Sequence, residues 1–437
     1  MFHRRGFLIG VAVTASAALP RANRTLGASP ALSNALDRYF APFERARDFS
    51  GIVLIERGKQ QLVQTWGRAE FASGRPHTLH TRYAAESISK MFTHSAVLGL
   101  QSAGKLSMSD PLARFIPDFP RSKEITIRQL VDHEAGISRD LAFVGGGGSR
   151  PHSTTEIVSL IAKTENAAPG HSSYSNNGYR ILARVIELAG GAGFEDLVRE
   201  LVFEPRGMGE TVFGGNTRQP MERRATGYIP DYGWRTIRKA DPWDFSNSRG
   251  AASYFTSPAD LMRFLRTLPL EPQDVGNAKG ALEGGRFARA AGHDGFGSGF
   301  ANLAFAYPNE DTRLVLLGNI QSGLFMSLQK DMRAILAGEP ADGPKIDRPS
   351  ELGPTDRWRE YVGSYELRPG APLVIRRAGD HLEVSAGEEF HPLIAVARNR
   401  FFMRLRYASM SFPAAPAPVD AIRWEEGGNA FTLKKLS

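Results

Sequence analysis

Ser87-Ile88-Ser89-Lys90 places a hydroxyl and an amine three residues apart at the start of an apolar stretch. In a helix, these two side chains lie on one face with Cβ atoms about 5–6 Å apart, close enough for the amine to take a proton from the serine. The pattern therefore predicts a nucleophile with its base. The same spacing recurs at Ser327 and Lys330, so the rest of the sequence has to decide between the two copies.

Two further short patterns follow the first copy in order, Tyr174-Ser175-Asn176 and His293-Asp294-Gly295. Flanking stretches match as well: Phe49-Ser50-Gly51-Ile52-Val53-Leu54, Gly104-Lys105-Leu106-Ser107, Ile125-Thr126-Ile127-Arg128-Gln129-Leu130 and Pro169-Gly170. Together they resemble the serine β-lactamase and penicillin-binding superfamily, specifically its class C-like branch of β-lactamases, esterases and D-alanyl-D-alanine peptidases. The resemblance covers residues from about 45 to about 335. It favours Ser87 as the nucleophile, because no tyrosine and histidine patterns follow Ser327.

The roles of the first two patterns follow from chemical need. A serine hydroxyl is a poor nucleophile without an adjacent base. Lys90 lies in an apolar stretch, so we expect desolvation to favour its neutral amine, which could take the Ser87 proton. Tyr174 is expected to relay that proton to the leaving group, with nearby cations favouring its phenolate. The sequence leaves open whether Lys90 or Tyr174 is the principal base.

The remaining candidates are expected to contact the substrate. The amide of Asn176 can hold a substrate carbonyl and hydrogen-bond Lys90, and it can equally cap a helix that begins near Tyr179. His293 is either a member of the site or an exposed loop residue. By resemblance, the backbone N–H groups of Ser87 and Phe296 stabilise the oxyanion, and Gly295 lets the strand approach the substrate closely.

The third pattern departs from the family. β-Lactamases and D-alanyl peptidases usually carry Lys-Thr-Gly where this chain has His293-Asp294-Gly295. Asp294 facing the pocket would repel a substrate carboxylate. We therefore expect poor turnover of penicillins and cephalosporins, and better turnover of uncharged esters or of substrates that bear an amine. A second departure, His133-Glu134-Ala135-Gly136 in place of His-Thr-Ser-Gly, is expected to affect the packing of a loop near the site.

Composition and the first residues predict an exported protein. Arg4 and Arg5 precede an apolar run that is too short to span a bilayer, which resembles a twin-arginine export signal over residues 1–28, cleaved after Ala17 or near Ala28. Cysteine is absent, which excludes thiolate nucleophiles. The net charge of +8 falls to +4 without the four arginines of this segment, and no basic run with interleaved aromatic residues points to nucleic acid.

The chain of 437 residues, 42% of them hydrophobic, is long enough for a large domain and a smaller one. Apolar runs predict hairpins at 52–66 and 300–320, and helices at 87–103, at 126–136 and at 179–189. We expect an α/β fold in which helices flank an antiparallel sheet over residues 29–338. A linker at 339–356 is followed by a small all-β barrel at 357–437, which resembles a lipocalin-like accessory domain. Gly145-Gly146-Gly147-Gly148 is interpreted as a mobile surface loop.

These patterns predict an exported, periplasmic or extracellular serine hydrolase. It would act on an ester, an amide or a D-amino-acid peptide bond, without cofactor or metal, because His77 and His80 lack a third ligand of suitable spacing. We expect a small-molecule substrate, with cell-wall fragments as one source, no nucleic acid and no transmembrane span in the mature chain. Two alternatives stay open. One is a penicillin-binding-like sensor that deacylates slowly or not at all, and the other is a partner-binding protein that uses the barrel.

Overall fold

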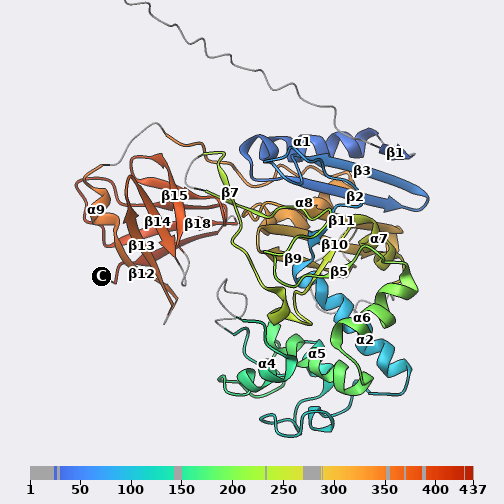
Figure 1. Ribbon diagram of the computed structural model, residues 1–437. Helices are drawn as coiled ribbons and strands as arrows, with labels where there is room; N and C mark the ends of the chain where they lie inside the picture. The colour runs from blue at the N-terminus through green and yellow to red at the C-terminus, as the bar shows by residue number, and fades with distance from the viewer. Residues whose placement is uncertain are drawn as a thin grey trace, which may run out of the picture.

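The computed structural model describes residues 24–26, 30–141, 150–231, 234–268, 287, 289–350, 355–368, 371–385, 390–427 and 429–436 (Figure 1). The glycine tract 145–148 lies outside the described residues. So does the predicted export signal, except that Arg24–Leu26 forms strand β1. In the described part of the chain, no helix combines the length and the apolar character needed to cross a bilayer.

The larger part of the chain is built on an antiparallel sheet with the strand order β1-β3-β2-β11-β10-β9. Its other strands are β2 (Gly51–Arg57), β3 (Gln60–Trp66), β9 (Ala291–Gly297), β10 (Phe300–Tyr307) and β11 (Thr312–Gly318). The predicted hairpins are therefore confirmed as β2–β3 and β10–β11. β9 lies at the edge of the sheet, where one side of the strand has no neighbour in the sheet.

Helices cover both faces of this sheet, which explains why its central strands are apolar throughout. Val53 and Ile55 pack with α1 (Pro30–Ala46) and α8 (Phe325–Ala337). Ile52 and Leu54 point the other way, because side chains alternate along a strand, and pack with α2 (Ser89–Ser102) and α7 (Pro258–Arg266). The sheet between helices confirms the expected fold class, and Figure 1 shows α1 and α2 on opposite sides of it.

The helices beyond α2 form a second layer. It contains α3 (Ile127–Val131), α4 (Thr154–Ile161), α5 (Asn176–Gly190) and α6 (Phe194–Val198), with short turns η1 (Glu86–Ile88), η2 (Leu112–Arg114), η3 (Arg199–Phe203), η4 (Glu204–Arg206) and η5 (Phe245–Ser248). Small strands complete this part: β4 (Tyr83–Ala84), β5 (Val212–Phe213) and β8 (Tyr254–Thr256) form one sheet, and β6 (Tyr228–Pro230) pairs with β7 (Ile237–Lys239). The turn η7 (Pro308–Glu310) joins β10 to β11.

Two of the predicted helices differ at their ends. The capping box at Thr126 and Gln129 is present, but α3 ends at Val131 and not at Gly136, since His133 adopts a left-handed φ of 58°. The helix expected from Tyr179 begins three residues earlier. Its N-cap is Ser175, whose Oγ accepts the Gly178 N–H at 2.9 Å. The expectation that Asn176 caps this helix is therefore wrong.

The C-terminal residues form an eight-stranded antiparallel sheet in which each strand pairs with the next along the chain. After α9 (Trp358–Tyr361) come β12 (Gly363–Arg368), β13 (Ala371–Ala378), β14 (His381–Ser385), β15 (His391–Ala397), β16 (Arg400–Met403), β17 (Ala408–Ser411), β18 (Ala421–Glu426) and β19 (Asn429–Lys434). A bridge between Tyr365 and Lys435 brings the first strand to the last, so the sheet nearly closes around its own apolar core. The predicted barrel is confirmed.

A buried ion pair joins the barrel to the larger part of the chain. Arg404, which follows β16, lies within 2.6 Å of an Asp48 oxygen, and the two side chains are 2% and 0% exposed. Tyr407 donates a hydrogen bond to the other oxygen of Asp48 at 2.7 Å. Arg404 also donates to the carbonyl oxygens of Ala46, Arg47 and Thr236. The barrel is thus held against the α1–β2 turn and the β6–β7 hairpin.

Candidate active site

Ser87 and Lys90 meet where η1 passes into α2. The Nζ of Lys90 lies 3.1 Å from Ser87 Oγ, as the spacing of one helical turn predicts. Lys90 is 1% exposed, and its Nζ also donates to Asn176 Oδ1 at 2.8 Å and to the Ala251 carbonyl at 3.0 Å. Ser87 itself is only half-buried, so its hydroxyl remains accessible.

The surroundings of Lys90 favour a neutral amine. Burial lowers its pKa to about 7, and the positive charge of Arg180 acts in the same direction, against the carboxylates of Asp140, Glu86 and Asp294. A neutral amine has two N–H groups, and the two carbonyl oxygens of Asn176 and Ala251 can accept both of them. Its lone pair is then directed at Ser87 Oγ, which is the arrangement that a base requires.

Tyr174 reaches the same serine from the loop before α5. Its hydroxyl donates to Ser87 Oγ at 2.8 Å. Burial raises the pKa of Tyr174 to about 12, although the hydrogen bond with Ser87 and the charge of Arg139 lower it. The expectation that nearby cations favour a phenolate is therefore wrong, because desolvation outweighs them. At neutral pH, Tyr174 holds its proton and can act as an acid.

His133 positions this tyrosine, which the sequence did not reveal. The imidazole stacks on the Tyr174 ring with centroids 4.6 Å apart, and its Nδ1 accepts the Ser175 N–H at 2.9 Å. Burial lowers the pKa of His133 to about 3, so the ring stays neutral. Gly136 lets the Tyr174 loop approach, because a Cβ there would lie 2.5 Å from the Ala167 carbonyl oxygen. The departure at residues 133–136 thus lies directly behind the site.

Asn176 is held in one orientation by a second carboxylate that the motifs do not contain. Its Nδ2 donates to Asp140 Oδ2 at 2.7 Å, which leaves Oδ1 for Lys90. Arg180, which is 4% exposed, pairs with the other oxygen of Asp140 at 2.6 Å. The structure therefore brings Asn176 to the site as an acceptor for the lysine, while one of its N–H groups is already committed.

The third pattern lies on the edge strand β9 beside η1. His293 is 6% exposed in this strand and not in an exposed loop, and burial lowers its pKa. Asp294 is 45% exposed. A Cβ on Gly295 would lie 2.5 Å from the Ala85 carbonyl oxygen, so this glycine lets the strand approach the backbone next to Ser87. Phe296 follows at the point where β9 passes the nucleophile.

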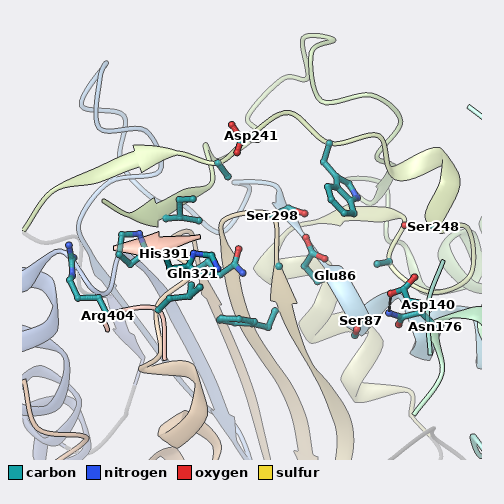
Figure 2. A pocket seen from close by; sticks show the side chains of 18 of the residues that line it. Glu86, Ser87, Asp140, Asn176, Asp241, Ser248, Ser298, Gln321, His391 and Arg404 are labelled. Atoms are coloured by element: carbon teal, nitrogen blue, oxygen red, sulfur yellow. Dashed lines mark hydrogen bonds between the residues drawn. The ribbon is translucent and has the colours of Figure 1, made fainter. Parts of the chain in front are cut away.

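A cavity of about 340 Å³ opens above Ser87 between the two parts of the chain (Figure 2). Its lining includes, from the larger part, Glu86, Ser87, Asp140, Asn176, Asp241, Trp243 and Phe296, and from the barrel His391, Pro392, Ile394, Arg404 and Leu405. His293 and Asp294 are not part of this lining. The carboxylates that face the cavity are Glu86, Asp140, Asp231 and Asp241, none of which the sequence patterns had marked.

The competing copy of the serine and lysine spacing has no such setting. Ser327 lies in α8, and its hydroxyl donates to the Leu324 carbonyl at 3.1 Å. His77 is also accounted for by structure, since its ring nitrogens lie within hydrogen-bond distance of Ser50 Oγ and Tyr83 Oη. In the ranges that the structure describes, no group of three or more potential metal ligands comes together.

Known proteins resemble this chain in sequence and in fold. The family described as Beta-lactamase matches residues 36–338. Penicillin-binding protein 4* of Bacillus subtilis (strain 168) is 25% identical over 435 residues, covering 90% of this chain and 96% of that protein. A D-aminopeptidase of Cereibacter sphaeroides is 27% identical over 426 residues, covering 90% and 80%. Among solved structures, a D-amino acid amidase from Ochrobactrum anthropi SV3 superimposes with a TM-score of 0.58 at 21% identity, covering 70% of this chain and 98% of the amidase.

Proposed function

Because the chain belongs to the beta-lactamase family, we propose that it is a serine hydrolase that cleaves amide or peptide bonds of D-amino acid derivatives through an acyl-enzyme on Ser87. The observation that carries this proposal is the convergence on Ser87 Oγ of Lys90 Nζ at 3.1 Å and Tyr174 Oη at 2.8 Å. The first supplies a base that is partly neutral near pH 7, and the second supplies an acid.

The reaction follows from these two contacts. Ser87 Oγ attacks the substrate carbonyl carbon, and its proton passes to the neutral amine of Lys90. The N–H groups of Ser87 and Phe296 are proposed to stabilise the oxyanion. When the C–N bond breaks, Tyr174 protonates the leaving nitrogen and regains a proton from the Lys90 side. Water then attacks the ester carbonyl and gives a proton to the neutral amine of Lys90, the bond to Oγ breaks, and Ser87 Oγ takes that proton.

The substrate class rests on the relatives and on charge. One relative is named a D-aminopeptidase, and its similarity extends over 90% of this chain. Of the four carboxylates that line the cavity, Asp140 pairs with Arg180 and Asp241 with Arg238, and Arg404 of the lining pairs with Asp48. The lining therefore still holds two acidic groups, Glu86 and Asp231, beyond these ion pairs. Such a cavity disfavours the free carboxylate of penicillins and cephalosporins and favours neutral or cationic substrates.

We further propose that the protein is exported through its twin-arginine segment. The paired Arg4 and Arg5 before an apolar run support this proposal. Cleavage after Ala17 would retain strand β1, whereas cleavage near Ala28 would remove it from the sheet. Replacement of both arginines by lysine in the full-length chain should leave the protein in the cytoplasm, and amino-terminal sequencing of the secreted form identifies the cleavage site.

The test uses the purified protein and a panel of substrates. D-Alanine p-nitroanilide should be hydrolysed faster than its L-isomer and faster than a chromogenic cephalosporin. Its kcat should also exceed that for p-nitrophenyl acetate. A fluorophosphonate should add one label at Ser87, visible by intact mass, and Ser87→Ala should lose both label and turnover. A permanent adduct with the cephalosporin but no turnover of any substrate would instead indicate a sensor. Rapid cephalosporin hydrolysis that Ser87→Ala abolishes would refute the substrate class.

A further inference from the structure

Glu86, the residue directly before the nucleophile, has a carboxylate that the mechanism does not use. Its side chain is 6% exposed and lines the cavity above Ser87. Its backbone adopts a φ of 51°, a left-handed conformation that is uncommon for residues other than glycine. This conformation accompanies a side chain that lines the cavity. Figure 2 shows Glu86 between Ser87 and Ser298.

The carboxylate lies along the strand that is expected to hold the oxyanion. A Cβ on Gly295 would be 3.1 Å from Glu86 Cβ, and a Cβ on Gly297 would be 2.9 Å from Glu86 Oε2. The side chain therefore runs past Phe296 at the edge of β9. Any acyl group attached to Ser87 with its oxygen toward Phe296 is placed next to this carboxylate.

One oxygen of Glu86 has no partner. Among the described residues, Oε1 is buried without a hydrogen bond. Burial raises the pKa of Glu86 to about 7, while a hydrogen bond with Ser298 and the charge of Lys90 lower it. The contacts of Lys90 Nζ are with Ser87, Asn176 and Ala251 and not with Glu86. A buried acceptor of this kind is costly unless a donor reaches it.

Two other carboxylates of the cavity already have cationic partners. Asp140 pairs with Arg180 at 2.6 Å, and Asp241, 80% exposed at the rim, lies 3.2 Å from Arg238. Glu86 combines burial, an open acceptor atom and a position beside the nucleophile. A donor that arrives with the substrate, and most strongly a cationic one, would satisfy it.

We propose that Glu86 binds the protonated α-amino group of the substrate, so that the site selects amino-acyl compounds with a free amine over N-acylated ones. The α-nitrogen is two bonds from the carbon that Ser87 attacks, and Glu86 and Ser87 are adjacent residues with Cα atoms about 3.8 Å apart. The ammonium donates to the carboxylate of Glu86, and no covalent bond is formed. This inference rests on the proposed function, because it names the residue that binds the amino end of a substrate cleaved at Ser87.

The test compares D-alanine p-nitroanilide with its N-acetyl derivative for the wild type and for Glu86→Gln, which keeps the size of the side chain. A hydrogen bond to a charged group corresponds to about a 10- to 100-fold change in binding, so the ratio of kcat/KM between the two substrates should fall by about that factor, mainly through KM. Asp241→Asn is the control, because it removes the same charge from the exposed rim of the cavity. The change that it causes in the kcat/KM ratio should be at least ten times smaller than the change caused by Glu86→Gln. Equal losses with both substrates in Glu86→Gln, an unchanged ratio, or equal effects of the two variants would overturn the proposal.

A second readout separates this inference from the proposed function. If the wild type hydrolyses neither anilide, the proposed function fails, and the rate of Ser87 labelling by a fluorophosphonate still reports binding. D-Alanine amide should slow wild-type labelling more than N-acetyl-D-alanine amide does, and Glu86→Gln should remove this difference. Equal protection by the two amides, or none by either, would overturn the assignment of Glu86.

Discussion

Removal of the guanidinium of Arg404 should destabilise the protein strongly, although this residue lies far from the nucleophile along the chain. In Arg404→Met, Asp48 stays buried without its cation, and the carbonyl oxygens of Ala46, Arg47 and Thr236 lose a donor. The methionine occupies a similar length without any N–H group. Tyr407 still donates to Asp48.

The size of the effect follows from the burial of both partners. Breaking a buried ion pair by removing one member costs about 3–5 kcal/mol, because a charge remains without compensation. Arg406→Met is the matched control. That arginine is 51% exposed and pairs with Glu426, and such a surface pair contributes about 0–1 kcal/mol.

The cost should also depend on pH in a definite direction. Burial raises the pKa of Asp48, and Arg404 lowers it, so the variant has a higher Asp48 pKa than the wild type. Between these two pKa values the folded variant binds a proton that the wild type does not. The destabilisation therefore grows as pH rises through this window, by about 1.4 kcal/mol per unit, and shrinks at acidic pH where Asp48 is neutral.

Urea unfolding at pH 5 and pH 8, followed by fluorescence, measures both effects for the wild type and the two variants. We expect a loss of several kcal/mol at pH 8, a smaller loss at pH 5, and partial recovery in Arg404→Met combined with Asp48→Asn. A loss below about 1 kcal/mol at pH 8, equal to that of Arg406→Met, would refute the reasoning, since it would mean that the pair is not buried in solution.

Three further predictions concern the site. The rate of Ser87 acylation should rise with pH through about 7, because burial lowers the Lys90 pKa to that value and only the neutral amine is a base. Lys90→Gln should slow labelling about 10²- to 10⁴-fold and abolish this rise with pH. An unchanged pH profile in the variant would assign the base to another group. His133→Leu should lower kcat about tenfold with little change in KM, because it removes the ring that stacks on Tyr174. In steady-state kinetics, the double variant with Tyr174→Phe should lose little more kcat than Tyr174→Phe alone, because both changes act through the tyrosine. Gly136→Ala should lower the free energy of unfolding by about 1–3 kcal/mol, since φ at this position is 68° and a Cβ would meet the Ala167 carbonyl. Thermal unfolding measures the change, and an unchanged Tm would contradict the close approach of Gly136 to Ala167.

Local patterns predicted the scaffold well where one physical signal dominates. Apolar runs predicted the β10–β11 hairpin, and the helix predicted from residue 126 begins as α3 at Ile127, where Thr126 and Gln129 form a capping box. The spacing of Ser87 and Lys90 predicted their contact, because one helical turn separates them. These features depend on neighbours in the chain, which a sequence displays directly.

Features that depend on tertiary neighbours were beyond the sequence. Asp140 and Glu86 belong to no motif, and only the folded chain shows that they face the cavity. The protonation of Tyr174 was predicted in the wrong direction, because the desolvation that raises its pKa cannot be read from nearby cations in the sequence. The position of Asp294 outside the lining of the cavity likewise depends on which side of β9 faces η1.

The shared cavity has an evolutionary consequence. The groups that surround Ser87 come from the larger part of the chain, whereas His391, Pro392 and Ile394 on β15 supply the opposite wall. Substitutions in that strand can reshape what the cavity admits without altering the Ser87, Lys90 and Tyr174 contacts. The chain can therefore diversify its choice of substrate through a module that carries none of the chemistry.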